Sequence, residues 1–203
     1  QYSAMCYENG GLVDDLLVYR LADHYMVVVN AANLDKDWAW MQKHLTPEVE
    51  LINRTDELSL LALQGPQAEP TLAKLTDLHL NDIPYYWLKV GNVSGVEMIV
   101  SRTGYTGEPG FELCFSVAHS EMIWQALMQA GAEFHIEPIG LGARDTLRLE
   151  MKYCLYGHDI DETTNPLEAG LGWITRLDKG DFIGKSAIQK VKEHGPTRKL
   201  VGF

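Results

Sequence analysis

The sequence predicts an α+β fold rather than a doubly wound parallel sheet. Strand-like and helix-like segments are interspersed along the 203 residues, without the regular alternation that parallel β-α-β units need. Hydrophobic residues make up 46% of the chain and charged residues 22%, which is ordinary for a globular protein and argues against disorder. A chain of this length accommodates one large domain or two small ones.

The N-terminal part has the pattern of a hairpin, a third strand and a helix. Residues 2–7 and 16–21 are strand-like, and the Asn-Gly-Gly between them tolerates a positive φ. A third β-rich run covers residues 25–29. Asn33 can cap a helix with two aspartates in its first turn, and this helix should end by residue 45, before a proline.

A second sector begins with a short apolar strand at residues 58–63. Gly65 and Pro66 should then open a helix that runs to about residue 75. The elements expected after it are strands at residues 86–90, 96–101 and 111–115, helices at 120–131 and 142–151, and an acidic loop at 156–167. Ser120 can cap the first of these helices.

The chain carries 17 basic and 28 acidic residues, for a net charge of −11. Nucleic acids and anionic membranes need a basic surface, so this charge argues against both as general partners but allows a local basic pocket for one anionic ligand. No apolar run approaches the roughly 18 residues that cross a bilayer. The three cysteines lie far apart without zinc-ligand spacing, which favours buried thiols in a reducing compartment.

An aspartate pair follows the hairpin turn. Neighbouring strand residues point to opposite faces, so Asp14 and Asp15 cannot share a face, and one carboxylate should lie beside apolar side chains. An unpaired charge in such a place is costly, and the pKa of the group is displaced. Such a group either satisfies the hairpin as a turn acid or is kept for a ligand, and the pattern leaves both alternatives open.

Residues 103–112, TGYTGEPGFE, form a glycine-rich loop. A dinucleotide-binding loop would lead into a helix, and no helix pattern follows here. The loop instead presents Tyr105 as a flat stacking surface and returns into a strand carrying Glu112, whose carboxylate can accept two parallel N–H bonds from an amidine-like ring edge. A tight turn with solvent-facing polar residues is the alternative.

The run GLGARDTLRLE at residues 140–150 places Arg144 near the start of a helix, where the helix dipole disfavours a cation. This placement indicates an anion or carbonyl partner, supplied by a ligand or by a nearby acidic side chain. Arg148, one turn later, is expected to be structural and bonded to a carboxylate.

Two further motifs fail on spacing. GDFIGKS at residues 180–186 has three residues between its glycines, where a nucleotide-binding P-loop has four. The acidic residues around His158 and Asp161 fit no calcium loop, so a solvated loop is expected there.

These motifs resemble those of the glycine cleavage system T protein family, the aminomethyltransferases. The matching stretches are residues 10–20, LALQGP at 61–66, SRTGYTGEPGFEL at 101–113, GLGARDTLRLE at 140–150 and LYGHDIDETTNPLEAGLGW at 155–173. The resemblance covers essentially the whole chain and implies the middle of such a protein, without the family's N-terminal segment and C-terminal β-barrel domain. The implied fold is an incomplete ferredoxin-like α+β part, residues 1–57, followed by a central antiparallel-sheet domain, residues 58–203.

The resemblance implies tetrahydrofolate as co-substrate and a lipoylated carrier (H) protein as partner. The aminomethyl group on the lipoyl arm would yield 5,10-methylenetetrahydrofolate and ammonia, in glycine catabolism. Metal, flavin, nicotinamide, nucleic acid and membrane are not implied. The expected location is cytoplasmic, or the mitochondrial matrix if the source is eukaryotic.

Six residues match folate-site positions of the family: Tyr2, Asn30, Asp15, Tyr105, Glu112 and Arg144. Asp15 is the second Asp of the family's GG-x-x-D-D motif and the expected essential carboxylate, near N10 of the folate. Glu112 and Arg144 match the acid and the base that bind the pterin. Tyr105 matches the aromatic residue that packs on the folate, and the remaining two match weaker contact positions.

Two alternatives share this architecture. One is the folate-binding half of a dimethylglycine or sarcosine dehydrogenase-like enzyme, in which a flavin domain comes first. The other is a non-catalytic folate-binding relative that regulates or helps to assemble other proteins. The joint presence of Asp15, Glu112 and Arg144 favours an active transferase over the non-catalytic relative.

Overall fold

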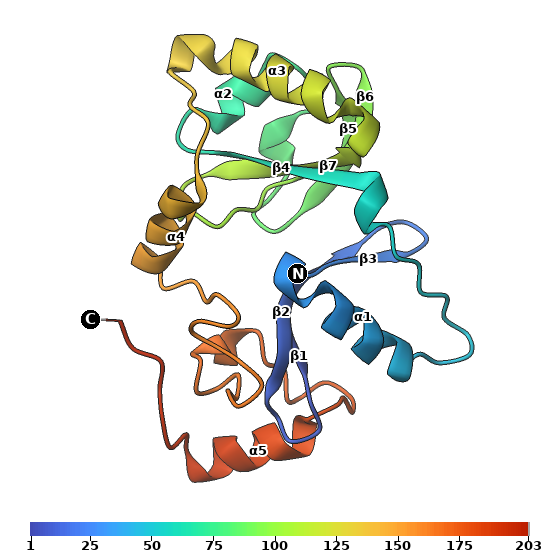
Figure 1. Ribbon diagram of the computed structural model, residues 1–203, viewed down its shortest axis with the longest axis vertical. Helices are drawn as coiled ribbons and strands as arrows, with labels where there is room; N and C mark the ends of the chain where they lie inside the picture. The colour runs from blue at the N-terminus through green and yellow to red at the C-terminus, as the bar shows by residue number, and fades with distance from the viewer. Residues whose placement is uncertain (203) are drawn as a thin grey trace. The chain divides into compact units, whose positions relative to one another are not determined.

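The computed structural model describes residues 1–202 and consists of two compact units (Figure 1). One unit contains residues 1–52 together with residues 154–203, and the other contains residues 53–153. This division differs from the expected boundaries of 1–57 and 58–203, because the C-terminal fifty residues pack with the N-terminal strands. Such a long-range association leaves no local pattern in the sequence.

The first unit contains a three-stranded antiparallel sheet in the order β1-β2-β3. Its elements are β1 (Tyr2–Cys6), β2 (Leu12–Arg20), β3 (Tyr25–Val28), α1 (Leu34–Lys43) and α5 (Lys185–His194). The predicted hairpin is confirmed, but β2 begins at Leu12, four residues earlier than expected, so that Asp14 and Asp15 belong to the strand. The register pairs Met5 with Asp14 and Ala4 with Asp15.

The core of the first unit joins both ends of the chain. Its buried members are Cys6, Leu12, Cys154, Ile160, Ala169, Leu171 and Ile188. They come from the hairpin, from the loops after Tyr153 and from α5. Burial of these apolar side chains stabilises the packing of the C-terminal segment against the N-terminal strands. Cys6 and Cys154 are buried free thiols, as expected, while Cys114 of the other unit is half-buried.

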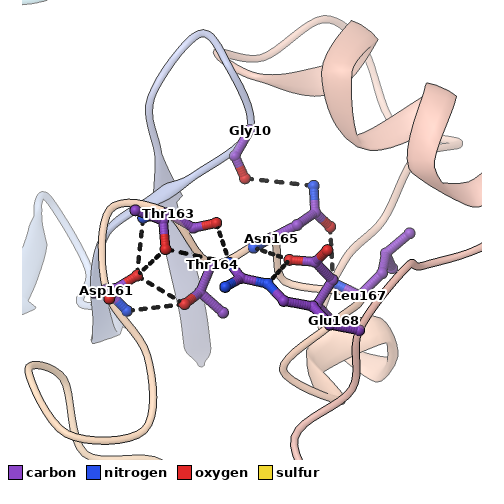
Figure 2. Close-up of polar contacts among 8 residues, drawn as sticks. Gly10, Asp161, Thr163, Thr164, Asn165, Leu167 and Glu168 are labelled. Carbon is purple, nitrogen blue, oxygen red and sulfur yellow. Dashed lines mark hydrogen bonds and ion pairs between the residues drawn. The ribbon is translucent and has the colours of Figure 1, made fainter.

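The expected acidic loop is folded onto the hairpin turn (Figure 2). The Leu12 N–H donates to the Thr164 carbonyl over 3.1 Å, and the Asn165 amide donates to the Gly10 carbonyl over 3.5 Å. Asp161, expected to be solvated, accepts bonds from the backbone and hydroxyl of Thr163 and from the Thr164 hydroxyl. These donors hold the pKa of Asp161 below its usual value.

The second unit contains a four-stranded antiparallel sheet in the order β4-β7-β6-β5. Its strands are β4 (Leu58–Gln64), β5 (Leu88–Val93), β6 (Val96–Ser101) and β7 (Gly110–Ser116), and its helices are α2 (Ala68–Ala73), α3 (Ser120–Gly131) and α4 (Leu141–Glu150). Leu72 of α2 and Ile123 and Leu127 of α3 pack with the apolar strand residues in one core, and both helices lie over the same face of the sheet (Figure 1).

Several local expectations were wrong in detail. Asn33 stands at the N-cap of α1, but its side chain makes no cap bond. Ser120 is the first residue of α3 rather than its cap, and its hydroxyl bonds the Val117 carbonyl and the Ser59 hydroxyl. Helix α5 was not predicted. Its first residue, Lys185, donates to the Lys179 and Gly180 carbonyls, so this lysine is bonded to the loop before the helix.

Candidate functional site

Asp15 is held by two neighbours in the first unit. The Tyr2 hydroxyl donates to Asp15 Oδ2 over 2.8 Å, and Asn30 Nδ2 lies 3.1 Å from Asp15 Oδ1 and 2.9 Å from the Asp15 carbonyl oxygen. Tyr2 precedes by two residues the Ala4 that pairs with Asp15, which places the two side chains on the same face of the hairpin. Two of the six predicted site residues, Tyr2 and Asn30, therefore bond a third, Asp15.

The surroundings of Asp15 disfavour its negative charge. Burial raises the pKa of Asp15, the hydrogen bond from Tyr2 lowers it, and the neighbouring Asp14 carboxylate raises it again, so that the pKa lies above its ordinary value. A half-buried carboxylate with a raised pKa and a fixed orientation is suited to interact with a developing positive charge.

Asp14 is the carboxylate that lies among apolar side chains, and it is fully buried. Its Oδ1 accepts bonds from Asn30 Nδ2 at 2.9 Å and Asn33 Nδ2 at 2.7 Å, while its Oδ2 accepts the Asn30 backbone N–H at 3.1 Å. Of the two alternatives, a structural acid or a ligand-binding one, Asp14 is therefore the structural acid, because donors within the protein satisfy its carboxylate. Because Asn30 bonds both aspartates, the position of Asp15 depends on that of Asp14.

A third acid, Asp37, is fully buried beside this pair. Burial, and next the neighbouring Asp14, raise the pKa of Asp37 to about 8. In the sequence, Asp37 is one of the two first-turn aspartates that the helix dipole favours, and its burial was not predicted. Its position between Leu34 and Met41, on the apolar face of α1, is the signal that identifies it, because a carboxylate inside an apolar helical stripe must be buried.

Tyr105 and Arg144 contact each other in the second unit. The Arg144 guanidinium lies over the Tyr105 ring, 4.6 Å from its centroid, and the Tyr105 ring stacks on Tyr153 at 5.8 Å with an angle of 21° between the planes. Arg144 is exposed and forms no ion pair with any residue in the range 1–202. The acidic side chain considered as its partner is therefore not present, whereas Arg148 is buried and bonded to Asp145, as expected.

Glu112 lies on β7, directly after the Tyr105 loop, and is half-buried. One of its carboxylate oxygens accepts a hydrogen bond from the Thr103 hydroxyl. Thr103 is in turn 3.0 Å from the Ser101 hydroxyl, and Ser101 bonds the Glu112 carbonyl. This chain of hydroxyl groups fixes the orientation of the Glu112 carboxylate.

Gln64, at the end of β4, organises the loop between Thr103 and Phe111. Its Nε2 donates to the Thr103 and Phe111 carbonyls, both over 3.1 Å. Gly104 makes room for it, since a Cβ there would come within 1.9 Å of the Gln64 Oε1. Gln64 belongs to the LALQGP motif, but this role was not predicted from the sequence.

The predicted residues form two groups, one in each compact unit. Tyr2, Asn30 and Asp15 are joined by hydrogen bonds, and Tyr105 and Arg144 are joined by ring contact, with Glu112 on the adjoining strand. A pocket of about 420 Å³ in the second unit is lined by the Arg102–Glu69 ion pair and Phe111 and includes none of the six.

Residues 1–202 contain neither a metal-binding cluster nor a membrane-spanning helix. No group of three or more His, Cys, Asp or Glu side chains is arranged to hold a metal ion. No helix in this part of the chain combines the length and the apolar character needed to span a membrane.

Comparison with known proteins decides the family. The family model described as the GCVT N-terminal domain matches residues 1–179. The chain belongs to this family. Its relatives include an aminomethyltransferase of Chloroherpeton thalassium, 60% identical over 100% of this chain and 56% of the relative, and one of Bacteroides fragilis, 55% identical over 100% of this chain and 57% of the relative. The chain thus spans a little over half the length of these relatives.

A solved structure confirms the fold. The crystal structure of the glycine cleavage system aminomethyltransferase T from Bartonella henselae matches with a TM-score of 0.84 and 34% identity, over 98% of this chain and 54% of that chain. The predicted α+β fold of the GCVT type and the resemblance stated from the motifs are both confirmed.

Proposed function

We propose that this GCVT-family chain serves a tetrahydrofolate-dependent aminomethyltransferase of the glycine cleavage system. In this reaction the methylene carbon passes from an aminomethyl-lipoyl carrier protein to tetrahydrofolate, with release of ammonia and of the reduced lipoyl arm. Family membership and relatives named aminomethyltransferase support the proposal. The observation that carries it is the oriented Asp15 carboxylate, which is bonded by Tyr2 and Asn30 and has a raised pKa.

Asp15 would act on the folate nitrogen that receives the carbon. The Asp15 carboxylate would lie near N10 of the folate. In a fixed position it can orient the attacking folate nitrogen and stabilise the positive charge that develops on the iminium carbon. Proton transfer to Asp15 is a secondary role, for which a raised pKa is favourable.

Tyr105, Glu112 and Arg144 would bind the folate itself. Glu112, oriented by Thr103, can accept N–H bonds from an aminopyrimidine edge. Arg144 has no acidic partner among the residues that the structure describes, so its donors are available to ring acceptors. Tyr105 offers an aromatic surface.

The partners in this proposal are the lipoylated carrier protein and tetrahydrofolate, which acts as a substrate. The named relatives come from bacteria, and in a bacterium we place the reaction in the cytoplasm.

Reconstitution with the full-length natural protein tests the proposal. The protein is mixed with aminomethylated lipoyl carrier protein and tetrahydrofolate, and methylenetetrahydrofolate and ammonia are measured together. We expect equal amounts of both products, and neither when the carrier or the folate is omitted. Folate binding without any turnover of the carrier contradicts the proposal and favours a non-catalytic relative. Methylene transfer from oxidised dimethylglycine, but not from the carrier, favours the dehydrogenase-like alternative.

A further inference from the structure

Asp37 is a buried acid for which the proposed reaction has no use. It lies in the first turn of α1 with an exposed fraction of 0%. Neither of its carboxylate oxygens has a hydrogen-bond partner among residues 1–202. A buried carboxylate without donors is strongly unfavourable, whereas a neutral carboxylic acid carries a proton of its own to donate.

Asp14 offers the acceptor that such a proton needs. Both Asn30 Nδ2 and Asn33 Nδ2 bond Asp14 Oδ1, whereas Asp14 Oδ2 accepts only the Asn30 backbone N–H among the residues described. A carboxylate oxygen accepts about two hydrogen bonds, so Oδ2 retains one acceptor position. The neighbouring Asp37 faces this carboxylate.

The charged groups around Asp37 also favour its neutral form. The charges of Asp14, and more weakly of Asp15, both on β2, oppose a third negative charge at Asp37. Tyr7 lies near it after β1. Lys36, its neighbour on α1, is the cation that favours ionisation, but its ammonium group lies over the Tyr156 ring, 3.7 Å from the centroid, and makes no ion pair with Asp37.

We infer that Asp37 is kept as a neutral carboxylic acid that donates to Asp14, and that it is a positioning residue for Asp15. It acts through a chain of contacts, because Asp14 holds Asn30 and Asn30 bonds both the side chain and the carbonyl of Asp15. An ionised Asp37 would repel the Asp14 carboxylate and so weaken the contacts that run from Asp14 through Asn30 to Asp15. The inference rests on the proposed role of Asp15.

The inference predicts a definite pH dependence of stability. The pKa of Asp37 is raised in the folded protein, to about 8, above its value in the unfolded chain. The folded state therefore binds more protons between these two pKa values, and the contribution of Asp37 to stability falls as the pH rises through this window. Asp37→Asn retains a donor for Asp14 but cannot ionise, so it removes this fall.

Thermal unfolding of the full-length protein tests the protonation state without any substrate. As the pH rises from about 5 to about 9, we expect the melting temperature of Asp37→Asn to increase relative to that of wild type. Asp35→Asn is the matched control, since Asp35 is exposed in the same helical turn, and its difference from wild type should stay constant. A constant difference for Asp37→Asn as well overturns the inference.

A second measurement does not depend on the folding of the variant. In wild-type protein, one aspartate side-chain carbon should titrate by NMR near pH 8, far above ordinary aspartates. The absence of any aspartate that titrates above about pH 6 overturns the inference.

Turnover tests the positioning role. The ratio of kcat for Asp37→Asn to that for wild type should rise about tenfold from near pH 7 to near pH 9, while the ratio of KM values for folate stays constant. A constant kcat ratio removes Asp37 as a positioning residue. If wild type does not turn over at all, the proposed function fails and the positioning role with it, while the melting and NMR measurements still report separately on the protonation of Asp37.

Discussion

Three aspartates in the first unit differ in role because their partners differ. Asp14 is fully buried and satisfied by the side chains of Asn30 and Asn33 and by a backbone N–H. Asp15, its neighbour in β2, is only partly buried and takes a tyrosine hydroxyl and one amide. Asp37 has no donor among the described residues and is suited to remain protonated. Strand β2 thus carries a fully buried, hydrogen-bonded acid beside a partly buried one.

At this scale, Arg144→Ala is expected to weaken folate binding by about tenfold or more, because a hydrogen bond from a charged donor contributes roughly 1.5–3 kcal/mol. Isothermal titration calorimetry measures the change. Arg176→Ala, which also removes an exposed charge, is the control and should bind folate as wild type does. An unchanged Kd for Arg144→Ala removes this residue from the folate site.

The sequence predicts the different environments of the two paired aspartates but not the side chains that bond them. Strand alternation in the sequence separates Asp14 from Asp15, and the structure shows one fully buried and one partly buried carboxylate. The contacts of Asn30 and Asn33 with Asp14 join positions 16 and 19 residues apart, so a local pattern instead predicted Asn33 to be a helix cap. The roles of the six predicted site residues remain predictions.

At the scale of elements, the Tyr105 loop depends on Gln64 of the neighbouring strand. The two backbone carbonyls that Gln64 bonds lie at the two ends of the loop, and the Thr106 hydroxyl donates to its Oε1 over 3.4 Å. A loop whose backbone carbonyls are bonded in this way keeps one conformation, and this fixes the positions of Tyr105 and Glu112, the proposed folate-binding residues.

Gln64→Leu is expected to loosen this loop while keeping the volume of the side chain. Loss of the amide leaves two partly buried carbonyls without their donor, which should reduce the free energy of unfolding by about 2 kcal/mol. Hydrogen exchange of residues 103–111 should accelerate, and folate binding should weaken. Gln189→Leu on α5, where the amide bonds only an exposed Glu193 among the described residues, is the control. Unchanged exchange in this loop contradicts the role of Gln64.

The existence of elements was more predictable than their limits. The strands of both sheets and the helices α1, α3 and α4 follow from hydrophobic periodicity and turn residues. The paired aspartates interrupt the apolar run at the start of β2, and the glycines and lysine before α5 resemble a P-loop, so neither start was predicted. The start of β2 depends on its pairing with β1, whereas the spacing of Ile188 and Val191 is a helical signal in the sequence itself.

At the scale of the whole molecule, the chain returns to its first unit after completing the second. The loop of residues 161–168 then lies against the hairpin turn (Figure 2). The approach is so close that only glycine fits at position 11. A Cβ on Gly11 would lie 1.8 Å from the Glu162 carbonyl oxygen. The C-terminal segment is thereby tied to the strand that carries Asp15.

Gly11→Ala is expected to destabilise the protein by about 3 kcal/mol, because backbone rather than a flexible side chain would have to move. Chemical denaturation of the full-length protein measures this loss. Gly180→Ala is the control, since nothing lies within 4 Å of the position that its Cβ would take. Equal stability of the two variants contradicts the close packing of this loop on the hairpin.

The most direct test of the central claim is Asp15→Asn, measured for both turnover and folate binding in the full-length protein. The amide keeps the size of the side chain and removes the charge. We predict that kcat with the aminomethylated carrier falls by about 100-fold or more, while the Kd for tetrahydrofolate from calorimetry changes by less than about threefold. Full turnover by this variant, or a loss that matches the loss of folate binding, would contradict the role of Asp15 in the transfer.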